Sequence, residues 1–245
     1  MNKIIVVNDD GYRSIGIDLL AQAFMPYGEV IMFAPSKEQS AKSQAITCWK
    51  PLKMKEVKGR KYKCYKVYGT PADCVRMASG LYDDISLVVS GINNGFNIGI
   101  DTLYSGTVGA ALDANLHGIN AMAFSAPRGL IASFEPYLKA TIAKCFEIID
   151  HLDGEMYCLN VNFPKDAQKV LGYKLTRVGY IVDNFEMIEY NRGFKPNKYN
   201  LHYDPSDLEI DYTAQQAGYI SISPLTIEKT NYKQFEIIKK TNLLK

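Results

Sequence analysis

Short apolar runs recur along the first two thirds of the chain, and most are followed by a stretch with helical spacing. The first run, from Ile4 to Val7, contains no polar residue and is rich in β-branched side chains. Such a run is typical of a strand that is buried on both faces of a parallel sheet. We predict strands over residues 3–7, 29–35, 84–91, 121–125 and 157–163.

The segments between these runs place apolar residues three and four positions apart, which predicts amphipathic helices. The clearest examples are residues 16–24, 107–116 and 134–149, and Gly118 provides a C-terminal stop for the second of them. Strands that alternate with helices favour right-handed crossover connections. We therefore predict an α/β fold with a doubly wound, mostly parallel sheet.

Two segments depart from this pattern. Residues 45–68 are predicted to form antiparallel strands rich in lysine and arginine, which we interpret as a solvent-exposed hairpin rather than a rim that attracts phosphate. Residues 70–73 have the composition of a helix N-terminus, with a threonine cap, a proline in the first turn and an acid at the third position.

The regular pattern fades after Pro164. Residues 192–207 are polar and irregular, residues 218–228 predict a strand, and residues 232–245 predict a helical or frayed end. We therefore predict a core over residues 1–165 and a C-terminal extension over residues 166–245. We expect this extension to pack on the core or on a partner subunit.

The composition is that of an ordinary globular protein, because 47% of the 245 residues are hydrophobic and 22% are charged. The formal net charge of +2 gives no general attraction to nucleic acid or to an anionic membrane. The five cysteines form no CxxC pair, which disfavours a zinc ribbon or a disulfide framework. No apolar stretch approaches the roughly 18 residues of a membrane-spanning helix. We expect a soluble, cytoplasmic protein with no nucleic-acid or membrane partner.

The first candidate for chemistry is the acidic pair Asp9 and Asp10, which directly follows the first strand. In an open parallel sheet, ligands bind beyond the carboxyl ends of the strands. Two adjacent carboxylates repel each other, and a hard divalent cation such as Mg²⁺ or Mn²⁺ would compensate their charge. The structural alternative is that one of the two acids only caps a turn or the next helix.

The second candidate is the glycine-rich segment over residues 90–118, which carries Asn93, Asn94 and Asn97. Residues 105–107, Ser-Gly-Thr, then begin a helix whose unpaired N–H groups and hydroxyls suit an anion. The structural alternative is a glycine-rich turn with a serine or threonine cap. The segment lacks the GK[ST] of a P-loop, and no G-x-G-x-x-G follows the first strand, which disfavours ATPase and dinucleotide sites.

A third segment, residues 36–47, places serines where the second strand ends and, taken alone, is an ordinary polar loop. The three histidines are isolated, and no G-x-S-x-G motif supports an esterase triad. Three strand ends thus offer an acidic pair, a serine loop and an amide loop that leads into an anion-binding helix. A metal ion beside a phosphate is the simplest arrangement that fits all three.

Several motifs resemble those of the SurE family of stationary-phase survival proteins, which are metal-dependent nucleotidases. The matching segments occur in the family's order and are NDDG, AP…QSAKS, GTPADCV, VVSGINNGFNIG, LYSGTVGAA and GYISISPL. The resemblance implies a Rossmann-like three-layer core and a phosphatase that acts on nucleoside 5′- and 3′-monophosphates. It also implies that elements of the C-terminal extension are exchanged in a homodimer or homotetramer.

The resemblance also assigns site residues. One divalent cation, Mn²⁺ or Mg²⁺, would be held by Asp9, Asp10, Ser40 and Asn93. The phosphate would be contacted by Asn97, Ser105, Gly106 and Thr107. Two departures from the family pattern, Arg13 and Lys42, would add positive charge near the phosphate without changing the ligand set.

Our leading hypothesis is therefore a metal-dependent 5′-nucleotidase in which Asp9 and Asp10 are the catalytic carboxylates and Asp9 assists the attacking water. A broader acid phosphatase or exopolyphosphatase remains an alternative, because base selection depends on loops that the sequence does not position. A non-catalytic magnesium-binding signalling domain is disfavoured. Such a domain needs a phosphorylatable aspartate after the third strand, where this chain has residues 90–93, Ser-Gly-Ile-Asn.

Overall fold

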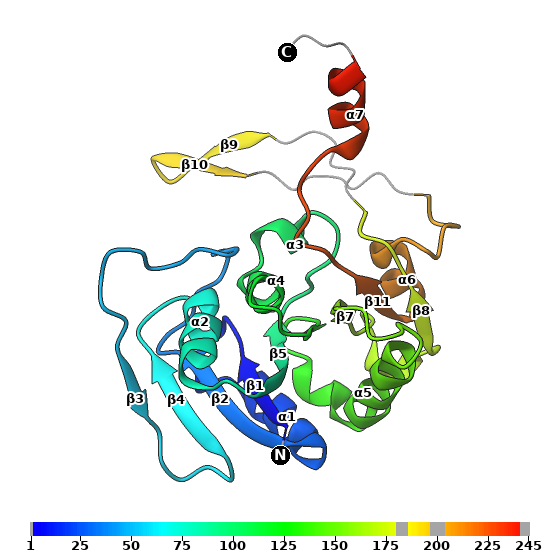
Figure 1. Ribbon diagram of the computed structural model, residues 1–245. Coiled ribbons are helices and arrows are strands. Elements are labelled where there is room, and N and C mark those ends of the chain that lie inside the picture. The colour runs from blue at the N-terminus through cyan, green and yellow to red at the C-terminus, as the bar shows by residue number, and fades with distance from the viewer. Residues whose placement is uncertain (1, 180–185, 197–203, 241–245) are drawn as a thin grey trace.

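Nine strands form one central sheet in the computed structural model, which describes residues 2–179, 186–196 and 204–240. The order of the strands is β3-β4-β2-β1-β5-β6-β7-β11-β8 (Figure 1). Their bounds are Lys3–Val7 (β1), Glu29–Pro35 (β2), Met54–Glu56 (β3), Lys63–Val67 (β4), Ile85–Asn94 (β5), Ala121–Ala126 (β6), Cys158–Asn162 (β7), Tyr173–Leu175 (β8) and Ile220–Pro224 (β11). A separate hairpin consists of Met187–Tyr190 (β9) and Gly193–Pro196 (β10).

The middle of the sheet is parallel. Strand β1 lies between β2 and β5 and pairs in parallel with both, and the parallel pairing continues through β4, β6 and β7. The residues from Ile4 to Val7 are at most 2% exposed, as expected for a strand covered on both faces. Strand β11 then pairs antiparallel with β7, and β3 pairs antiparallel with β4. The predicted doubly wound, mostly parallel sheet is confirmed.

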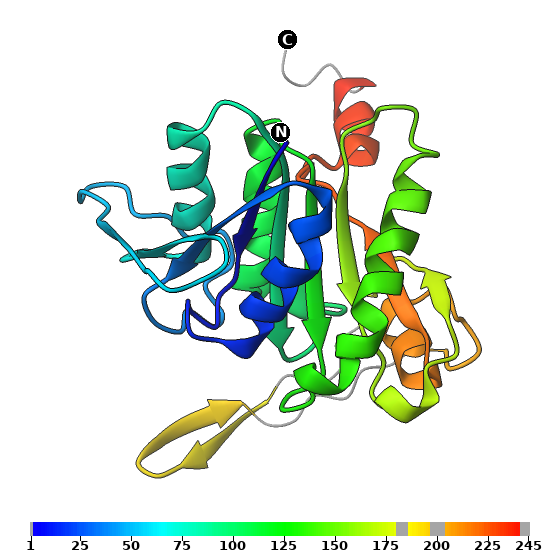
Figure 2. The same ribbon diagram turned by 90° about the horizontal axis from the view of Figure 1, so that it is seen from below.

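Helices cover both faces of the sheet (Figures 1 and 2). Helices α1 and α5 pack on one face, and α2 and α4 pack on the other. The α-helix bounds are Ile15–Phe24 (α1), Pro71–Leu81 (α2), Asp101–Tyr104 (α3), Gly106–Leu116 (α4), Glu135–Ile149 (α5), Asp211–Ala217 (α6) and Tyr232–Lys240 (α7). Short 3₁₀ turns occupy Met25–Tyr27, Ile131–Phe134 and Ala167–Lys169.

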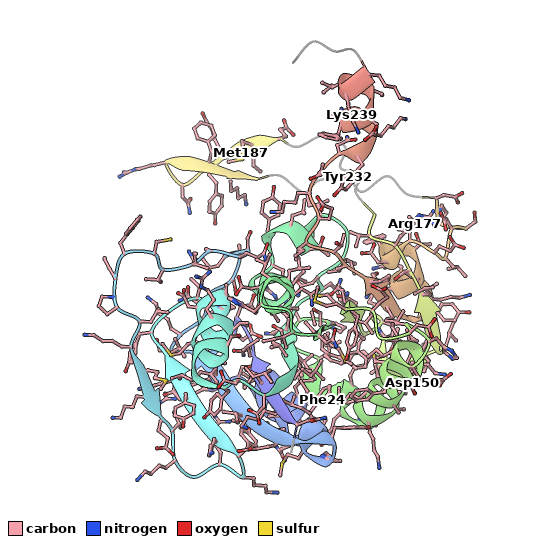
Figure 3. The ribbon with its side chains drawn as sticks, in the orientation of Figure 1. Phe24, Asp150, Arg177, Met187, Tyr232 and Lys239 are labelled. Atoms are coloured by element: carbon pink, nitrogen blue, oxygen red, sulfur yellow. The ribbon has the colours of Figure 1, made fainter. Side chains whose placement is uncertain are left out.

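Each face of the sheet has its own hydrophobic core. On the α1–α5 face, the ring of Phe24 meets those of Phe124 and Phe146 at centroid distances of 6.0 and 6.4 Å. These contacts join α1, β6 and α5, and Phe24 lies inside the body of the protein (Figure 3). On the other face, Val75 of α2 and Val108 of α4 belong to the cluster that covers β1 and β2. The three-layer core is therefore confirmed.

Several predicted boundaries need correction. Strand β5 continues to Asn94, three residues beyond the predicted end at residue 91. The segment over residues 45–68 does contain an antiparallel pair, but β4 also pairs in parallel with β2, so it extends the main sheet. The expectation of irregular structure over residues 192–207 is wrong for Gly193–Pro196, which forms β10, and residues 197–203 lie outside the described residues.

The C-terminal extension contributes to two different places. Its strands β8 and β11 complete the edge of the main sheet, whereas α7 and the β9–β10 hairpin project from the body (Figures 1 and 2). The α7 residues Tyr232 and Lys239 and the hairpin residue Met187 lie away from the core (Figure 3). The division at residue 165 and the role in subunit contact stay predictions. Residues 180–185 and 241–245 lie outside the described part of the chain.

In the described part of the chain, no helix combines the length and the apolar character needed to cross a bilayer.

The N-terminus of α2 is fixed by a capping box, as predicted for residues 70–73. The Thr70 hydroxyl accepts a hydrogen bond from the Asp73 N–H at 3.1 Å, and the Asp73 carboxylate accepts one from the Thr70 N–H at 2.9 Å. Asp73 is 1% exposed and also accepts hydrogen bonds from the N–H and hydroxyl of Thr47. The cap thereby ties the start of α2 to the loop that precedes β3.

We predict that Thr70→Ala lowers the free energy of unfolding by about 1 kcal/mol, because the N–H of Asp73 loses its side-chain acceptor. Thr70→Ser, which keeps the hydroxyl, should retain most of that stability. Urea denaturation followed by circular dichroism measures both. Equal unfolding midpoints for the alanine variant and the wild type would contradict the prediction.

Candidate functional site

The carboxyl ends of the parallel strands meet at one edge of the sheet, where their arrowheads point the same way (Figure 2). The loops that follow β1, β2, β5 and β6 enclose a cavity of about 390 Å³ at this edge. The cavity is lined by Asp9, Asp10, Glu38, Ser40, Ala41, Asn93, Asn94, Gly95, Phe96, Asn97, Asp101, Tyr104, Ser105 and Arg128. The strand-end positions singled out in the sequence are therefore brought together.

Asp9 is buried at the end of β1, where it is 4% exposed. The hydroxyl of Thr107 donates a hydrogen bond to its Oδ1 at 2.7 Å. Helix α4 begins directly against this carboxylate, because a Cβ at Gly106 would lie 3.0 Å from the Asp9 Cβ and 3.1 Å from Oδ2. Glycine at position 106 thus allows the start of α4 to approach the acid closely.

Burial raises the pKa of Asp9 to about 6; the hydrogen bond from Thr107 opposes this shift and the negative charge of Asp10 adds to it. Asp10 is half-buried, and its Oδ2 accepts a hydrogen bond from the N–H of Asn94 at 3.0 Å. Burial also raises the pKa of Asp10, and the hydrogen bond from Asn94 lowers it. The negative charge of Glu38 adds to the rise, and the positive charge of Arg128 opposes it. Neither acid has a basic side chain within ion-pairing distance among the described residues, so their mutual repulsion is not relieved by a salt bridge.

Ser40 and Asn93 add neutral oxygens to the same cavity. The Ser40 hydroxyl donates its hydrogen to Glu38 at 2.6 Å, and a hydroxyl oxygen that donates in this way can still bind a cation through its lone pairs. The Asn93 side-chain amide donates to the Gly95 carbonyl at 2.8 Å, which fixes the orientation of the amide. With Asp9 and Asp10, these residues form a donor set made only of oxygens.

This donor set fits a hard divalent cation. Magnesium and manganese take carboxylate, hydroxyl and amide oxygens and complete their coordination with water. Within the described ranges, no group of three or more His, Cys, Asp or Glu side chains is arranged to hold a metal ion. Two neighbouring carboxylates with raised pKa values are also the groups whose charge a cation would compensate.

The serine loop over residues 36–47 is positioned by backbone contacts on two sides. The N–H of Gln39 donates to the Asp9 carbonyl at 2.7 Å. The N–H and hydroxyl of Ser43 donate to the carbonyls of Tyr104 and Leu103 at 2.9 and 2.8 Å. A Cβ at Gly109 would lie only 2.2 Å from the Ser43 carbonyl, so this glycine lets the loop lie against α4.

Asn97 lines the cavity and is held in place by hydrogen bonds to residues of β6 and β7. Its N–H and side-chain amide donate to Asn162 and to Ser125, both at 2.8 Å. The side chain of Asn160 donates to the Asn97 carbonyl at 2.7 Å. Asp211, on α6 of the C-terminal extension, accepts a hydrogen bond from the Gly99 N–H at 2.8 Å. Buried side chains from β6, β7 and α6 thus fix the amide loop.

At the N-terminus of α4, Ser105 lines the cavity and acts as the helix cap, because its hydroxyl accepts a hydrogen bond from the Val108 N–H at 3.0 Å. Gly106 and Thr107 lie behind it and do not line the cavity. The Thr107 hydroxyl is used on Asp9. The Thr107 backbone N–H also acts on the Asp9 carboxylate, so a contact from this turn to an anion would come from the Gly106 N–H.

The sequence analysis missed several residues of the cavity wall. Arg128 follows the end of β6, so the same strand-end argument that selected Asp9 could have found it. Glu38 and Tyr104 do not directly follow a strand, so the strand-end argument does not select them. Arg13 and Lys42, which we expect to add positive charge near the phosphate, do not line this cavity, and their effect stays a prediction. Arg13 lines an adjacent depression beside Asp10, and Lys42 lines a separate groove along α4.

The chain is similar to known proteins over most of its length. The family model described as "Survival protein SurE" matches residues 4–182. A protein named 5′-nucleotidase SurE from Myxococcus xanthus is 40% identical and aligns over 94% of this chain and 89% of its own length. One of the same name from Campylobacter lari is 36% identical over 98% of each chain.

A solved structure gives the same result. The crystal structure of a SurE protein from Aquifex aeolicus matches with a TM-score of 0.79 and 34% sequence identity. The match covers 98% of this chain and 99% of the other. By sequence and by fold, the chain belongs to the SurE survival-protein family.

Proposed function

We propose that this protein is a metal-dependent phosphomonoesterase that hydrolyses nucleoside 5′- and 3′-monophosphates to nucleoside and phosphate. One observation carries the proposal. The buried acid Asp9 and its neighbour Asp10 meet two neutral oxygen donors and the N-terminus of α4 in a single cavity. The relatives named 5′-nucleotidase support the choice of a nucleotide as substrate.

Asp9, Asp10, Ser40 and Asn93 would hold one Mg²⁺ or Mn²⁺. When bound, such a cation neutralises phosphate charge, polarises the phosphorus–oxygen bond and lowers the pKa of a water molecule. The Thr107 hydroxyl keeps Asp9 oriented and favours its ionised form. Asp9 is therefore the carboxylate that we propose accepts a proton from the attacking water.

The phosphoryl oxygens would bind at the start of α4. The backbone N–H groups of Gly106 and Thr107 belong to the first turn of the helix, where no intrahelical acceptor exists. The Gly106 N–H, the Ser105 hydroxyl and the side chain of Asn97 would be the donors to the anion, whereas the Thr107 N–H also acts on the Asp9 carboxylate. Because these donors are held by the fold, they need no rearrangement when charge develops during the reaction.

The nucleoside would lie against aromatic side chains at the cavity. Phe96 and Tyr104 both line it, and Tyr104 is 58% exposed. The Tyr104 carbonyl accepts a hydrogen bond from the Ser43 N–H, which helps to hold the backbone that carries the ring. A base can stack on such a ring. This surface favours a nucleotidase over the alternative of a broad acid phosphatase or exopolyphosphatase.

We also propose a cytoplasmic location and a homodimeric or homotetrameric state. All five cysteines are free thiols, and four of them are buried, which suits a reducing compartment. Helix α7 buries none of its residues, yet it exposes Tyr232, Phe235, Ile237 and Ile238 to between 50% and 59%. Tyr232, Phe235 and Ile238 follow one another at intervals of three residues and so form an apolar face, which a second copy of the chain would cover.

The central test is phosphate release from a panel of nucleoside monophosphates with Mn²⁺ or with EDTA. We expect EDTA to abolish hydrolysis and Asp10→Asn to reduce kcat/KM by at least about 100-fold, the scale for losing one electrostatic contact in a transition state. Asp153→Asn is the matched control, because Asp153 is exposed in a turn. Hydrolysis that survives both EDTA and Asp10→Asn would rule out the metal-dependent reaction.

We predict that Tyr104→Leu lowers kcat/KM for nucleoside monophosphates by about tenfold, the scale for losing one stacked base. Ribose 5-phosphate, which has no base to stack, should be hydrolysed at an unchanged rate. Tyr104→Phe keeps the ring and is the conservative control. An equal loss for ribose 5-phosphate would show that Tyr104 supports the cavity rather than the base.

We predict that Phe235→Asp shifts the assembly in solution to a smaller species, because it places a charge on the apolar face of α7. Lys233→Asp changes a polar position on the same helix and should leave the mass unchanged. Light scattering after size-exclusion chromatography measures both. A monomeric wild type, or an unchanged mass for Phe235→Asp, would contradict the role of α7.

A further inference from the structure

The cavity wall is strongly acidic. Asp9, Asp10, Glu38 and Asp101 contribute carboxylates, and Arg128 is the one Lys, Arg or His side chain among its described lining residues. A single divalent cation balances only part of this negative charge. A phosphate monoester is itself an anion with up to two charges at neutral pH. Further positive charge from the protein would favour its binding, and Arg128 lines the same cavity.

The backbone around Arg128 is fixed on both sides. The N–H of Gly95 donates to the Ala126 carbonyl at 2.9 Å, and the N–H of Gly129 donates to the Asn94 side chain at 2.7 Å. Asn94 also donates its own N–H to Asp10 at 3.0 Å. The loop that carries Arg128 is thus tied to the same strand end as the acidic pair.

Arg128 acts on Asp10 at longer range, where its charge opposes the rise in the pKa of that acid. The Arg128 side chain is exposed and forms no ion pair with another described residue. Other arginines are already engaged: Arg60 pairs with Asp18, and Arg177 pairs with Asp207 and Glu209. Arg128 combines a fixed backbone with a guanidinium that is available to a ligand.

We propose that Arg128 binds the phosphoryl group of the substrate and shares its oxygens with the N-terminus of α4. The planar guanidinium donates two parallel hydrogen bonds to neighbouring phosphate oxygens, which the ammonium of a lysine does not reproduce. This inference rests on the proposed function and adds a substrate-binding residue to it. Arg128 would hold the phosphate in the ground state and during the charge redistribution of the reaction.

The test measures phosphate and metal binding separately from turnover. Binding of inorganic phosphate to the Mn²⁺-loaded protein is followed by calorimetry, and Mn²⁺ binding is measured in the absence of phosphate. We expect Arg128→Gln to weaken phosphate binding by about 10- to 100-fold, the range for a lost charge-assisted pair. The phosphate affinity of Arg128→Lys should lie between that of the wild type and that of Arg128→Gln. Mn²⁺ affinity should be unchanged or higher, because a positive charge near Asp10 has been removed.

Two matched variants separate a direct contact from a general field. Arg13→Gln removes an equal charge from the depression beside Asp10, and Arg76→Gln removes one from the exposed side of α2. Both should change phosphate binding by no more than about twofold, as expected for screened surface charges. A comparable loss of phosphate binding in Arg13→Gln would mean that the general positive charge around the cavity, and not a direct contact from Arg128, attracts the phosphate. That result would overturn the proposal.

Unchanged phosphate binding in Arg128→Gln would also overturn the proposal, and so would a parallel loss of Mn²⁺ binding. The failure of the proposed function has a different signature. In that case the wild type releases no phosphate from any nucleotide, whereas the phosphate titrations of the Mn²⁺-loaded wild type and Arg128→Gln still decide the role of Arg128.

Discussion

The repulsion between two adjacent carboxylates at the end of a buried strand is the constraint on which this structure depends. Asp9 is almost fully buried, and burial together with Asp10 raises its pKa to about 6. A fold keeps such a pair only where something compensates the charge. The Thr107 hydroxyl compensates part of it, and the oxygen donors around the cavity fit a cation that would compensate the rest.

The surrounding architecture serves to hold these groups in place. Parallel strands deliver their carboxyl ends to one edge, and close approaches at Gly106 and Gly109 bring α4 against both Asp9 and the serine loop. Behind the cavity, buried amides on β7 hold the loop of Asn97. The C-terminal extension takes part, because Asp211 anchors the same loop through Gly99. One set of hydrogen bonds and close backbone contacts thus positions the residues of the cavity at the sheet edge.

The pattern of apolar and polar residues alone predicted the middle of the sheet well, because a short, uninterrupted, β-branched run such as Ile4–Val7 is typical of a strand buried on both faces. It failed for α6, which buries the polar residues Asp211, Thr213 and Gln215 and so has no apolar stripe to detect. Strand-end position predicted where Asp9 and Asn93 would lie. Ser40 gained a role only through family resemblance. Arg128 was missed although it follows a strand end, because a single arginine after Pro127 forms no motif that draws attention to that position.

The most direct test of the central claim is anomalous diffraction from crystals soaked with Mn²⁺ and phosphate. The account predicts one manganese peak within coordination distance of Asp9 and Asp10, with a phosphate between that peak and the N-terminus of α4. A cavity without a manganese peak, with both carboxylates turned toward bulk solvent, would contradict it.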